Sequence, residues 1–374
     1  MIKKIINKIL YYLPLKFLLK DYIIFESGPD YADNTYYVYN ELLNQGYNKK
    51  YKFIWLVNNK EEFKDKKIDN VIFVNYGSKE AESYRKRAKF IIDSNKYVHK
   101  YNKYQYRFHL GHGMPIKLVP EYTSGCGRVD NYLVTSDYFI PFFSECTKLA
   151  KEKFLSLGFP RCDQFFMNKG QFKELEGYDK VILWMPTYRK HTGGIGYKSS
   201  LRYGVPSINS EKELLELNKL LKKYDALLII KLHPAEDVSI LDKVELTNIL
   251  FTKNELLDSN KKNIYELANL TDALITDYSS IYFDYLLHDK PIGMAIGDIE
   301  EFSKNFSLYF NDFPNELPGE YIYNYDDLEK FIINVCNGKD IKREERNKKR
   351  SIYVKYNDGN TSKRIVDILK KHSL

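Results

Sequence analysis

The segment His109-Leu-Gly-His-Gly-Met-Pro-Ile-Lys117 sets one histidine, His112, between two glycines and close to a proline. Glycine and proline at this spacing favour a tight, exposed turn. An exposed imidazole gains and loses a proton near neutral pH, as a general base must. Because a lone histidine is more often structural than catalytic, the assignment depends on its companions. With them, the sequence predicts that His112 is a catalytic base.

Four more polar clusters follow apolar runs that are typical of strands: Gly158-Phe-Pro-Arg161, Met185-Pro-Thr-Tyr-Arg189, Lys231-Leu-His-Pro234 and Thr276-Asp-Tyr-Ser-Ser280. The arginine fork suits phosphate oxygens, although each arginine taken singly is as well explained by a salt bridge. His233 ends a strand pattern and could donate a hydrogen bond to a phosphoryl oxygen. Strand-end clusters repeated in this way indicate a ligand-binding cleft.

Ser279 and Ser280 come between an apolar strand pattern and a helical pattern. Hydroxyls and free backbone N–H groups at the start of a helix can bind an anion such as phosphate, and the alternative is that a serine simply caps the helix. Phosphate-loop, dinucleotide-binding and serine-hydrolase motifs are absent, and the four cysteines show no metal-ligand spacing. Transfer chemistry on a phosphorylated donor, without a metal site, therefore remains.

The length of 374 residues suits two domains, and 58 Lys+Arg against 50 Asp+Glu give a net charge of +8. A positive charge favours an anionic partner, namely a phosphorylated substrate, an acidic lipid or nucleic acid. The charged run at residues 342–350 is more typical of a solvated helix face than of a nucleic-acid contact. We therefore expect no nucleic-acid partner.

Apolar runs alternate with helix-like segments in two series, which predicts an α/β protein with two parallel sheets that face an interdomain cleft. The expected strands of the first series are 22–25, 51–57, 70–74, 89–92 and 132–135. Those of the second are 181–185, 226–231, 249–252, 273–276 and 292–295. Polar breaks at residues 165–178 mark the seam. The expected domains are 21–170 and 171–345, with a helical segment at 346–374.

Residues 1–20 combine isoleucines and leucines at helical spacing with lysines between them, which predicts a basic amphipathic helix. Such a helix either packs on the protein or lies in a membrane interface, where acidic headgroups attract the lysines. No run approaches the roughly 18 to 20 apolar residues that a membrane span needs, and no cleavage site for a signal peptide follows. We therefore expect a cytoplasmic location.

Taken in order, the motifs resemble those of the CDP-glycerol glycerophosphotransferases, the primases and polymerases of wall teichoic acid and related capsule enzymes. The resemblance runs from about residue 22 to near the end of the chain. The matching residues are Ile24-Phe-Glu-Ser27 with Asn34, His112 to Lys117, Gly158 to Arg161, Pro186 to Arg189, Lys231 to Pro234, Thr276 to Ser280 with Asp284 and Lys290-Pro291, Tyr309-Phe310 with Pro318-Gly319, and Asp358-Gly359 with Arg364.

This resemblance implies a GT-B arrangement of two Rossmann-like domains, peripheral attachment to the inner face of the cell membrane, and CDP-glycerol as donor without a cofactor. It implies that His112 deprotonates an acceptor hydroxyl and that CMP leaves. We predict His112 and His233 as the catalytic histidines. The predicted donor and phosphate ligands are Arg189, Ser279, Ser280, Asp277, Arg161 and Lys117. The implied partners are a CDP-linked polyol, a lipid-linked or polymeric acceptor and the membrane surface, and a homo-oligomer is compatible with all of these.

Met114 stands where the family usually has threonine, which implies an altered preference for acceptor or polyol. CDP-ribitol is therefore an alternative donor. The resemblance is equally compatible with an enzyme that transfers a single polyol phosphate unit and with one that makes a polymer. A GT-B glycosyltransferase that uses a nucleotide sugar would have the same architecture. A basic, membrane-associated binding module without activity is a third hypothesis, which the strand-end clusters disfavour.

Overall fold

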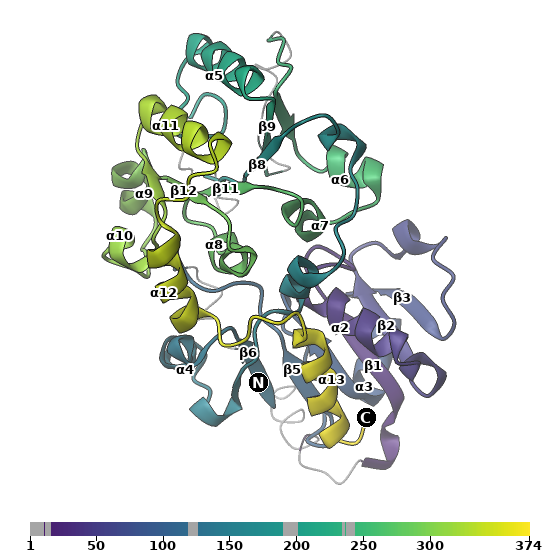
Figure 1. Ribbon diagram of the computed structural model, residues 1–374. Coiled ribbons are helices and arrows are strands. Elements are labelled where there is room, and N and C mark those ends of the chain that lie inside the picture. Colours follow the sequence, from purple (N-terminus) through teal and green to yellow (C-terminus); the bar gives the residue numbers. More distant parts are fainter. Residues whose placement is uncertain (1–10, 12–15, 119–125, 190–200, 234–235, 237–243) are drawn as a thin grey trace. The chain divides into compact units, whose positions relative to one another are not determined.

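The computed structural model describes residues 11, 16–118, 126–189, 201–233, 236 and 244–374 of the chain (Figure 1). The chain divides into two compact units. Unit 1 comprises Met1–Met114, Val119–Phe166 and Tyr353–Leu374, and unit 2 comprises Pro115–Leu118 and Met167–Ile352. Most of the predicted helix at residues 1–20 lies outside the described residues. Within that range a 3-10 helix spans Lys16–Leu18 and the first strand begins at Lys20.

Unit 1 holds a seven-stranded sheet in the order β3-β2-β1-β4-β5-β6-β7, and all of its neighbouring strands pair in parallel. The strands are β1 (Lys20–Glu26), β2 (Lys52–Val57), β3 (Val71–Asn75), β4 (Ala88–Asp93), β5 (Tyr106–His109), β6 (Asn131–Val134) and β7 (Phe154–Ser156). The helices are α2 (Asp33–Asn44), α3 (Lys79–Arg87), α4 (Ile140–Thr147) and α13 (Thr361–Lys371), with 3-10 helices at Tyr47–Lys49, Lys60–Phe63, Asp137–Phe139, Lys151–Lys153 and Pro160–Phe166, the last called η7.

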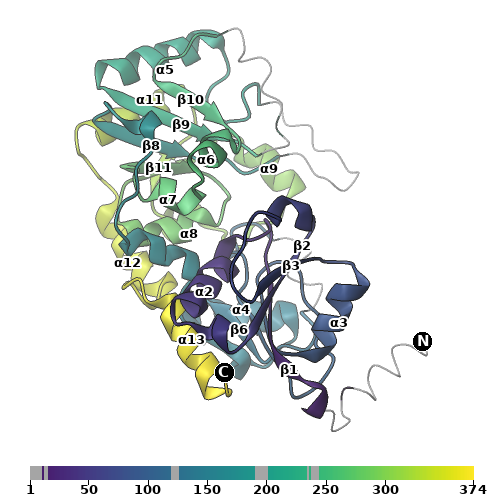
Figure 2. The same cartoon turned by 90° about the vertical axis from the view of Figure 1, so that its right-hand side faces the viewer.

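Helices cover both faces of the unit 1 sheet, as the apolar character of its strands requires. Tyr39 of α2 packs edge-on against Phe25 and Trp55 on one face. Ala81 of α3 joins Ile24 in the buried cluster on the other. Figure 2 shows α2 and α3 on opposite sides of β1 and β2.

Unit 2 holds a six-stranded, wholly parallel sheet in the order β10-β9-β8-β11-β12-β13. The strands are β8 (Lys180–Trp184), β9 (Ala226–Lys231), β10 (Ile249–Thr252), β11 (Ala273–Thr276), β12 (Ile292–Ala295) and β13 (Glu320–Ile322). The helices are α5 (Glu211–Lys223), α6 (Glu255–Asn260), α7 (Ile264–Ala268), α8 (Ile281–Tyr285), α9 (Ile299–Asn305), α10 (Phe313–Glu316), α11 (Tyr325–Cys336) and α12 (Arg343–Tyr353), with 3-10 helices at Lys173–Leu175 and Leu286–His288.

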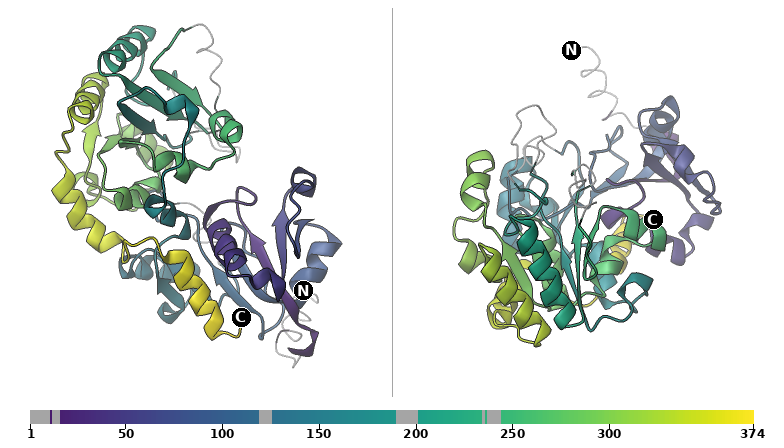
Figure 3. Two further views of the ribbon diagram at one scale, coloured as in Figure 1. Left: turned by 45° about the vertical axis from the view of Figure 1, so that its right-hand side comes forward. Right: turned by 90° about the horizontal axis from the view of Figure 1, so that it is seen from above.

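The core of unit 2 forms where α5 and α11 cover one face of this sheet (Figures 1 and 3). Leu214, Leu217 and Leu221 of α5 pack with Phe331 and Ile332 of α11 against the strands. Their spacing of three and four residues gives each helix one apolar face. Ser210 begins α5 with a reciprocal capping box to Glu213, which explains why the helix starts there.

The α/β class and the two Rossmann-like halves predicted from the sequence are confirmed. Each predicted strand overlaps an observed one, whereas β5, β7 and β13 were not predicted. In both units the strand order begins 3-2-1-4-5-6, the doubly wound order of Rossmann folds. The cleft between the two lobes remains a prediction.

Among the described residues, no helix is both long and apolar enough to cross a membrane.

Candidate active site

His112 lies in the turn that follows β5 in unit 1. Gly111 has a φ of +65°, a left-handed conformation that glycine adopts without strain, and it lets the chain turn directly before the histidine. The His112 side chain is 57% exposed. Its Nδ1 lies 2.6 Å from Oδ2 of Asp33, the first residue of α2. The imidazole is therefore held at one nitrogen and accessible to a ligand.

Asp33 is itself held by its surroundings. Its side chain is only 5% exposed, and Arg161 Nη1 donates to its Oδ1 over 2.6 Å. The same Nη1 donates to the backbone carbonyl of His112, also over 2.6 Å. Asn34 donates to the carbonyl of Gly111. We call these four residues, His112, Asp33, Asn34 and Arg161, the His112 cluster.

The backbone at Asp33 is strained. Its φ is +55°, in the left-handed region that residues other than glycine seldom adopt. Such conformations cost of order 1–3 kcal/mol and persist only where the surroundings impose them, often at functional sites. Here the strain places the Asp33 carboxylate between the imidazole and the guanidinium.

The charge state of Asp33 fixes the role of each imidazole nitrogen. Burial raises the pKa of Asp33, but the charges and hydrogen bonds of Arg161 and His112 outweigh burial and hold this pKa at about 2. An ionised carboxylate can only accept hydrogen bonds, so Nδ1 of His112 must donate. In the neutral ring Nε2 then carries the lone pair, and it can take a proton from a ligand. Chemically, this arrangement is suited to general-base catalysis.

His109, the other histidine of this motif, is buried. Its Nδ1 lies 2.8 Å from Asp93, which also accepts a hydrogen bond from Arg107 Nε over 2.9 Å. Burial lowers the pKa of His109 despite the nearby Asp93 charge. This network braces the ends of β4 and β5, and it leaves His112 as the accessible histidine of the pair.

In unit 2, Arg189 and Asp277 form an internal ion pair behind the ends of β8 and β11. Arg189 Nη1 lies 2.5 Å from Asp277, and Nε lies 2.9 Å from Asp298. Asp277 also accepts hydrogen bonds from the backbone and hydroxyl of Thr187 and from the backbone of Tyr278. The side chains of Arg189 and Asp277 are 2% and 0% exposed. We predicted both as phosphate ligands, but in this structure their charges satisfy one another.

Arg161 is likewise engaged with groups of the protein. It was expected to bind phosphate, yet its side chain is 4% exposed and its guanidinium holds Asp33 and the carbonyl of His112. A buried arginine beside a carboxylate is favourable only when the pair stays together. Arg161 therefore serves to fix the His112 cluster.

Ser279 and Ser280 lie partly exposed between β11 and α8. Their backbone carbonyls accept the first hydrogen bonds of the following turn. Their hydroxyls have no hydrogen-bond partner among the described residues, and Ser280 makes no side-chain cap. The hydroxyls are thus available to a ligand, at the point beside β8 and β11 where the strand order reverses and ligands of such sheets bind.

His233 and Lys117 also lie in unit 2. The exposed His233 ring stacks on Tyr188 with centroids 4.3 Å apart. Partial desolvation, followed by the charges of Lys231 and Lys117, lowers the pKa of His233, so its ring is mostly neutral at pH 7. Lys117 pairs with Leu308 through an isolated antiparallel bridge. Of the predicted residues, His112 and Arg161 belong to unit 1 and the other six to unit 2.

The sequence prediction missed two carboxylates, Asp33 and Asp298. Asp33 is 79 residues from His112, and Asp298 is 109 residues from Arg189, so no local spacing links the partners. The sequence did offer one indication of Asp33. It directly precedes Asn34, one of the residues that match the family resemblance, in the segment after the first strand. In the described part of the chain, no group of three or more His, Cys, Asp or Glu side chains could hold a metal ion.

The chain matches a family model described as CDP-Glycerol:Poly(glycerophosphate) glycerophosphotransferase over residues 8–371. It is 25% identical over 272 residues to the teichoic acid ribitol-phosphate primase of Bacillus spizizenii, covering 68% of this chain and 61% of that protein. It is 24% identical over 386 residues to the teichoic acid poly(glycerol phosphate) polymerase of Staphylococcus epidermidis, covering 93% and 50%. The chain therefore spans between 50% and 61% of the length of these two relatives.

Among solved structures, the wall teichoic acid polymerase TagF has the same fold, with a TM-score of 0.73 at 23% identity, over 99% of this chain and 95% of that one. A putative UDP-N-acetylglucosamine 2-epimerase from Listeria monocytogenes is more distant, with a TM-score of 0.55 at 11% identity.

Proposed function

This chain belongs to the CDP-glycerol:poly(glycerophosphate) glycerophosphotransferase family, and we propose that it transfers a polyol phosphate from a CDP-linked polyol to an acceptor hydroxyl. The observation that carries the proposal is His112, an exposed imidazole whose Nδ1 is held by a buried, ionised aspartate. A nucleotide-sugar transferase of the same fold remains the alternative, because architecture alone does not choose the donor.

In the proposed reaction, Nε2 of His112 takes the proton of the acceptor hydroxyl. The hydroxyl oxygen bonds to the β-phosphorus of the donor, the bond from that phosphorus to the bridging oxygen breaks, and CMP leaves. Phosphoryl transfer asks the protein mainly for positioning and for stabilisation of charge. Asp33 and Arg161 supply the positioning, because they fix the orientation of the imidazole.

The donor diphosphate is proposed to bind at the strand ends of unit 2. The hydroxyls of Ser279 and Ser280 and the N–H of His233 would donate to its oxygens, and Lys117 would supply positive charge. Arg189 and Asp277 would act indirectly, since their buried ion pair fixes the segments after β8 and β11. No cofactor enters this proposal, because the CDP-linked polyol is itself the activated donor.

We propose CDP-glycerol as the donor, in line with the family description. CDP-ribitol is the second candidate, because one relative is a ribitol-phosphate primase. Another relative is a poly(glycerol phosphate) polymerase, so the relatives divide between the two polyols. A variant of TagF has been soaked with CDPG, and the likeness of this chain to TagF supports the proposal of a CDP-linked donor. Met114, where the resemblance implies a threonine in the family, is buried, so it would change polyol preference only by altering the packing beside His112.

A donor screen tests the proposal. CMP release is measured with CDP-glycerol, CDP-ribitol and UDP-sugars in the presence of a teichoic acid acceptor. We expect turnover with a CDP-linked polyol and none with UDP-sugars. Turnover with UDP-sugars alone would replace the proposal by the glycosyltransferase, whereas a lack of any nucleotide affinity would favour a binding module.

The acceptor is proposed to be a lipid-linked or polymeric polyol phosphate at the inner face of the cell membrane. The family description supports a polyol phosphate acceptor, and the basic, amphipathic pattern of residues 1–20 supports attachment to the membrane. Sedimentation with anionic vesicles compares the full chain with a variant that lacks these residues. We expect binding to fall with the deletion, to fall in high salt, and to be weak with neutral vesicles. Equal sedimentation of both proteins would exclude the anchoring role.

A further inference from the structure

We propose that Asp163 and the C-terminal helix α13 position the His112 cluster, so that the end of the chain contributes to the transfer rate through Arg161 and Asp33. This inference rests on the proposed role of His112 as the base. In it, Asp163 is a positioning residue and touches neither substrate nor the reacting atoms.

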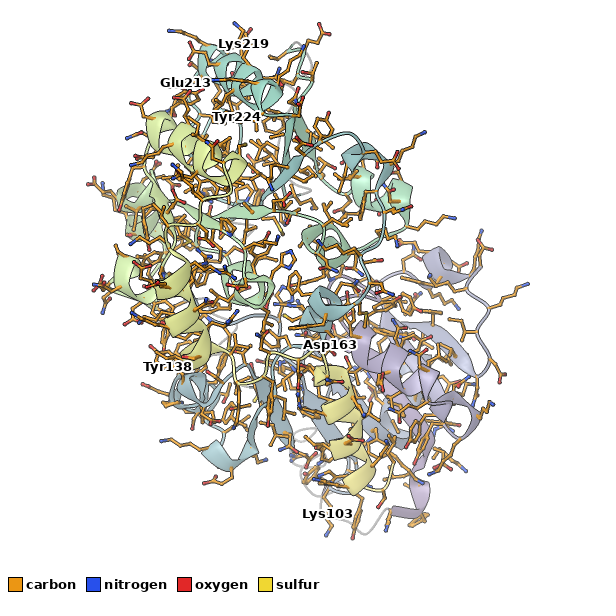
Figure 4. All side chains as sticks on the ribbon, viewed as in Figure 1. Lys103, Tyr138, Asp163, Glu213, Lys219 and Tyr224 are labelled. Carbon is orange, nitrogen blue, oxygen red and sulfur yellow. The ribbon has the colours of Figure 1, made fainter. Side chains whose placement is uncertain are left out.

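Asp163 joins two segments that lie 198 residues apart in the chain. It belongs to η7, two residues after Arg161, and is almost fully buried. Its Oδ1 accepts from the backbone N–H of Thr361 over 2.9 Å. Its Oδ2 accepts from the backbone N–H and the hydroxyl of Ser362 over 2.8 and 2.7 Å. In Figure 4, Asp163 is labelled beside the first turn of α13.

These bonds satisfy N–H groups that a helix leaves without partners in its first turn. A residue just before the helix usually supplies such a cap, but Asn360, which stands there, makes no side-chain cap hydrogen bond. The cap of α13 comes instead from Asp163 of η7, the 3-10 helix that also carries Arg161.

Close packing fixes the same contact. Gly359 has a φ of +65°, and a Cβ on it would lie 2.5 Å from Cβ of Phe166 in η7. Gly158 has a φ of +90°, and a Cβ on it would lie 3.1 Å from the Thr361 hydroxyl oxygen. A side chain at Gly359 would push the two segments apart, and one at Gly158 would require the Thr361 side chain to shift slightly. Arg364 forms an ion pair with Asp358, which closes the turn before α13.

Helix α13 contacts both elements that supply partners of His112. It packs against η7, which carries Arg161, and along α2, which begins with Asp33. Figures 1 and 2 show α13 beside α2. Ile365, Val366 and Leu369 form its buried face. Because α2 and η7 also pack on each other, the three elements form one rigid support beneath the Asp33–Arg161 pair.

The expected consequence is a change in rate without a change in donor binding. A displacement of about 1 Å at a catalytic group can cost on the order of 100-fold in rate. We expect Asp163→Ala to lower kcat at least about tenfold, with the KM for the donor, proposed to bind in unit 2, within about twofold of wild type. Asp163→Asn keeps one acceptor oxygen and should recover part of the rate.

The matched control is Ser78→Ala in the same unit. Ser78 caps α3 by accepting from the backbone N–H of Ala81 over 3.0 Å, so its loss removes a helix cap of unit 1 that lies outside the His112 cluster. We expect this variant to keep the wild-type kcat. Ser362→Ala removes a single hydrogen bond of the Asp163 cap and serves if Asp163→Ala does not fold. If Asp163→Ala folds and has the same kcat as Ser78→Ala, the proposal is overturned. If only Ser362→Ala folds, the same comparison is made between Ser362→Ala and Ser78→Ala.

A second measurement does not depend on activity. Nitrogen-15 NMR of the imidazoles reports which ring nitrogen of His112 carries the proton, with the signal assigned by its loss in His112→Gln. We expect Nδ1 protonation in the wild type and in Ser78→Ala, and mixed tautomers in Asp163→Ala. An unchanged tautomer in Asp163→Ala contradicts the positioning role. His112→Ala could keep full activity while the His112 tautomer of the otherwise unchanged protein still changes in Asp163→Ala. That result would show that His112 is not the base but that Asp163 does orient its ring.

Discussion

At the scale of single residues, the structure separates arginines and histidines that sequence type alone cannot distinguish. Arg161 and Arg189 are buried against carboxylates, and His109 is buried against Asp93, whereas His112 is exposed. The difference comes from partners far away in the chain. Residue type therefore suggested candidate groups, and tertiary contacts decide which of their side chains are exposed.

Asp33→Asn tests the orientation of His112. An amide at this position could donate a hydrogen bond to Nδ1, which would move the ring proton to Nε2 and remove the base. Because general-base catalysis typically contributes 100- to 10,000-fold, we expect kcat to fall about 100-fold or more with unchanged donor affinity. The rate is measured by CMP release, with a melting curve to check folding. A variant that keeps the wild-type kcat would show that Asp33 does not orient the base.

Ser279→Ala combined with Ser280→Ala tests the proposed donor site. Hydrogen bonds to a charged group are worth about 1.5–3 kcal/mol each, so we expect the KM for CDP-glycerol to rise at least about tenfold. Ser259→Ala, an exposed serine of α6 in the same unit, is the control and should behave as wild type. An unchanged KM in the double variant would show that the donor diphosphate does not bind at these hydroxyls.

At the scale of elements, the carboxyl ends of the parallel strands carry the polar groups of both units. In unit 1, Glu26 ends β1 and Asp93 ends β4 as direct register partners. One oxygen of Glu26 accepts from the backbone N–H groups of Asn95 and Lys96, and the other has no partner among the described residues. Burial and the charge of Asp93 raise the pKa of Glu26 to about 8. A carboxyl group is thus held protonated at neutral pH behind the turn that leads to Asp33.

This shift predicts how stability depends on pH. The unfolded chain loses the Glu26 proton near pH 4.5, whereas the folded state keeps it until about pH 8. The contribution of Glu26 to folding stability is therefore full below pH 4.5 and is lost as the pH rises towards about 8. Glu26→Gln cannot ionise and should escape this loss. We expect the variant to gain stability relative to wild type between pH 5 and pH 9, measured by denaturant unfolding. If the difference in stability between the variant and the wild type stayed constant from pH 5 to pH 9, the raised pKa of Glu26 would be refuted.

At the scale of the whole molecule, hydrophobic pattern predicted both sheets because their central strands are nearly continuous apolar runs. It missed β5, where Arg107 and His109 interrupt the pattern, since their burial depends on Asp93 from β4. It also missed β7 and β13, which have three residues each and carry little periodicity. The return of α13 to unit 1 was equally hidden, because it depends on contacts such as that of Asp163 with Ser362.

CMP release from CDP-glycerol with a verified acceptor, compared between wild type and His112→Ala, tests the role of His112 most directly. His99→Ala, an exposed histidine of the same unit outside the His112 cluster, is the matched control. We expect His112→Ala to lose at least about 100-fold in kcat while it still binds the donor, and His99→Ala to keep the wild-type rate. A folded His112→Ala protein that transfers at the wild-type rate would contradict the assignment of His112 as the base.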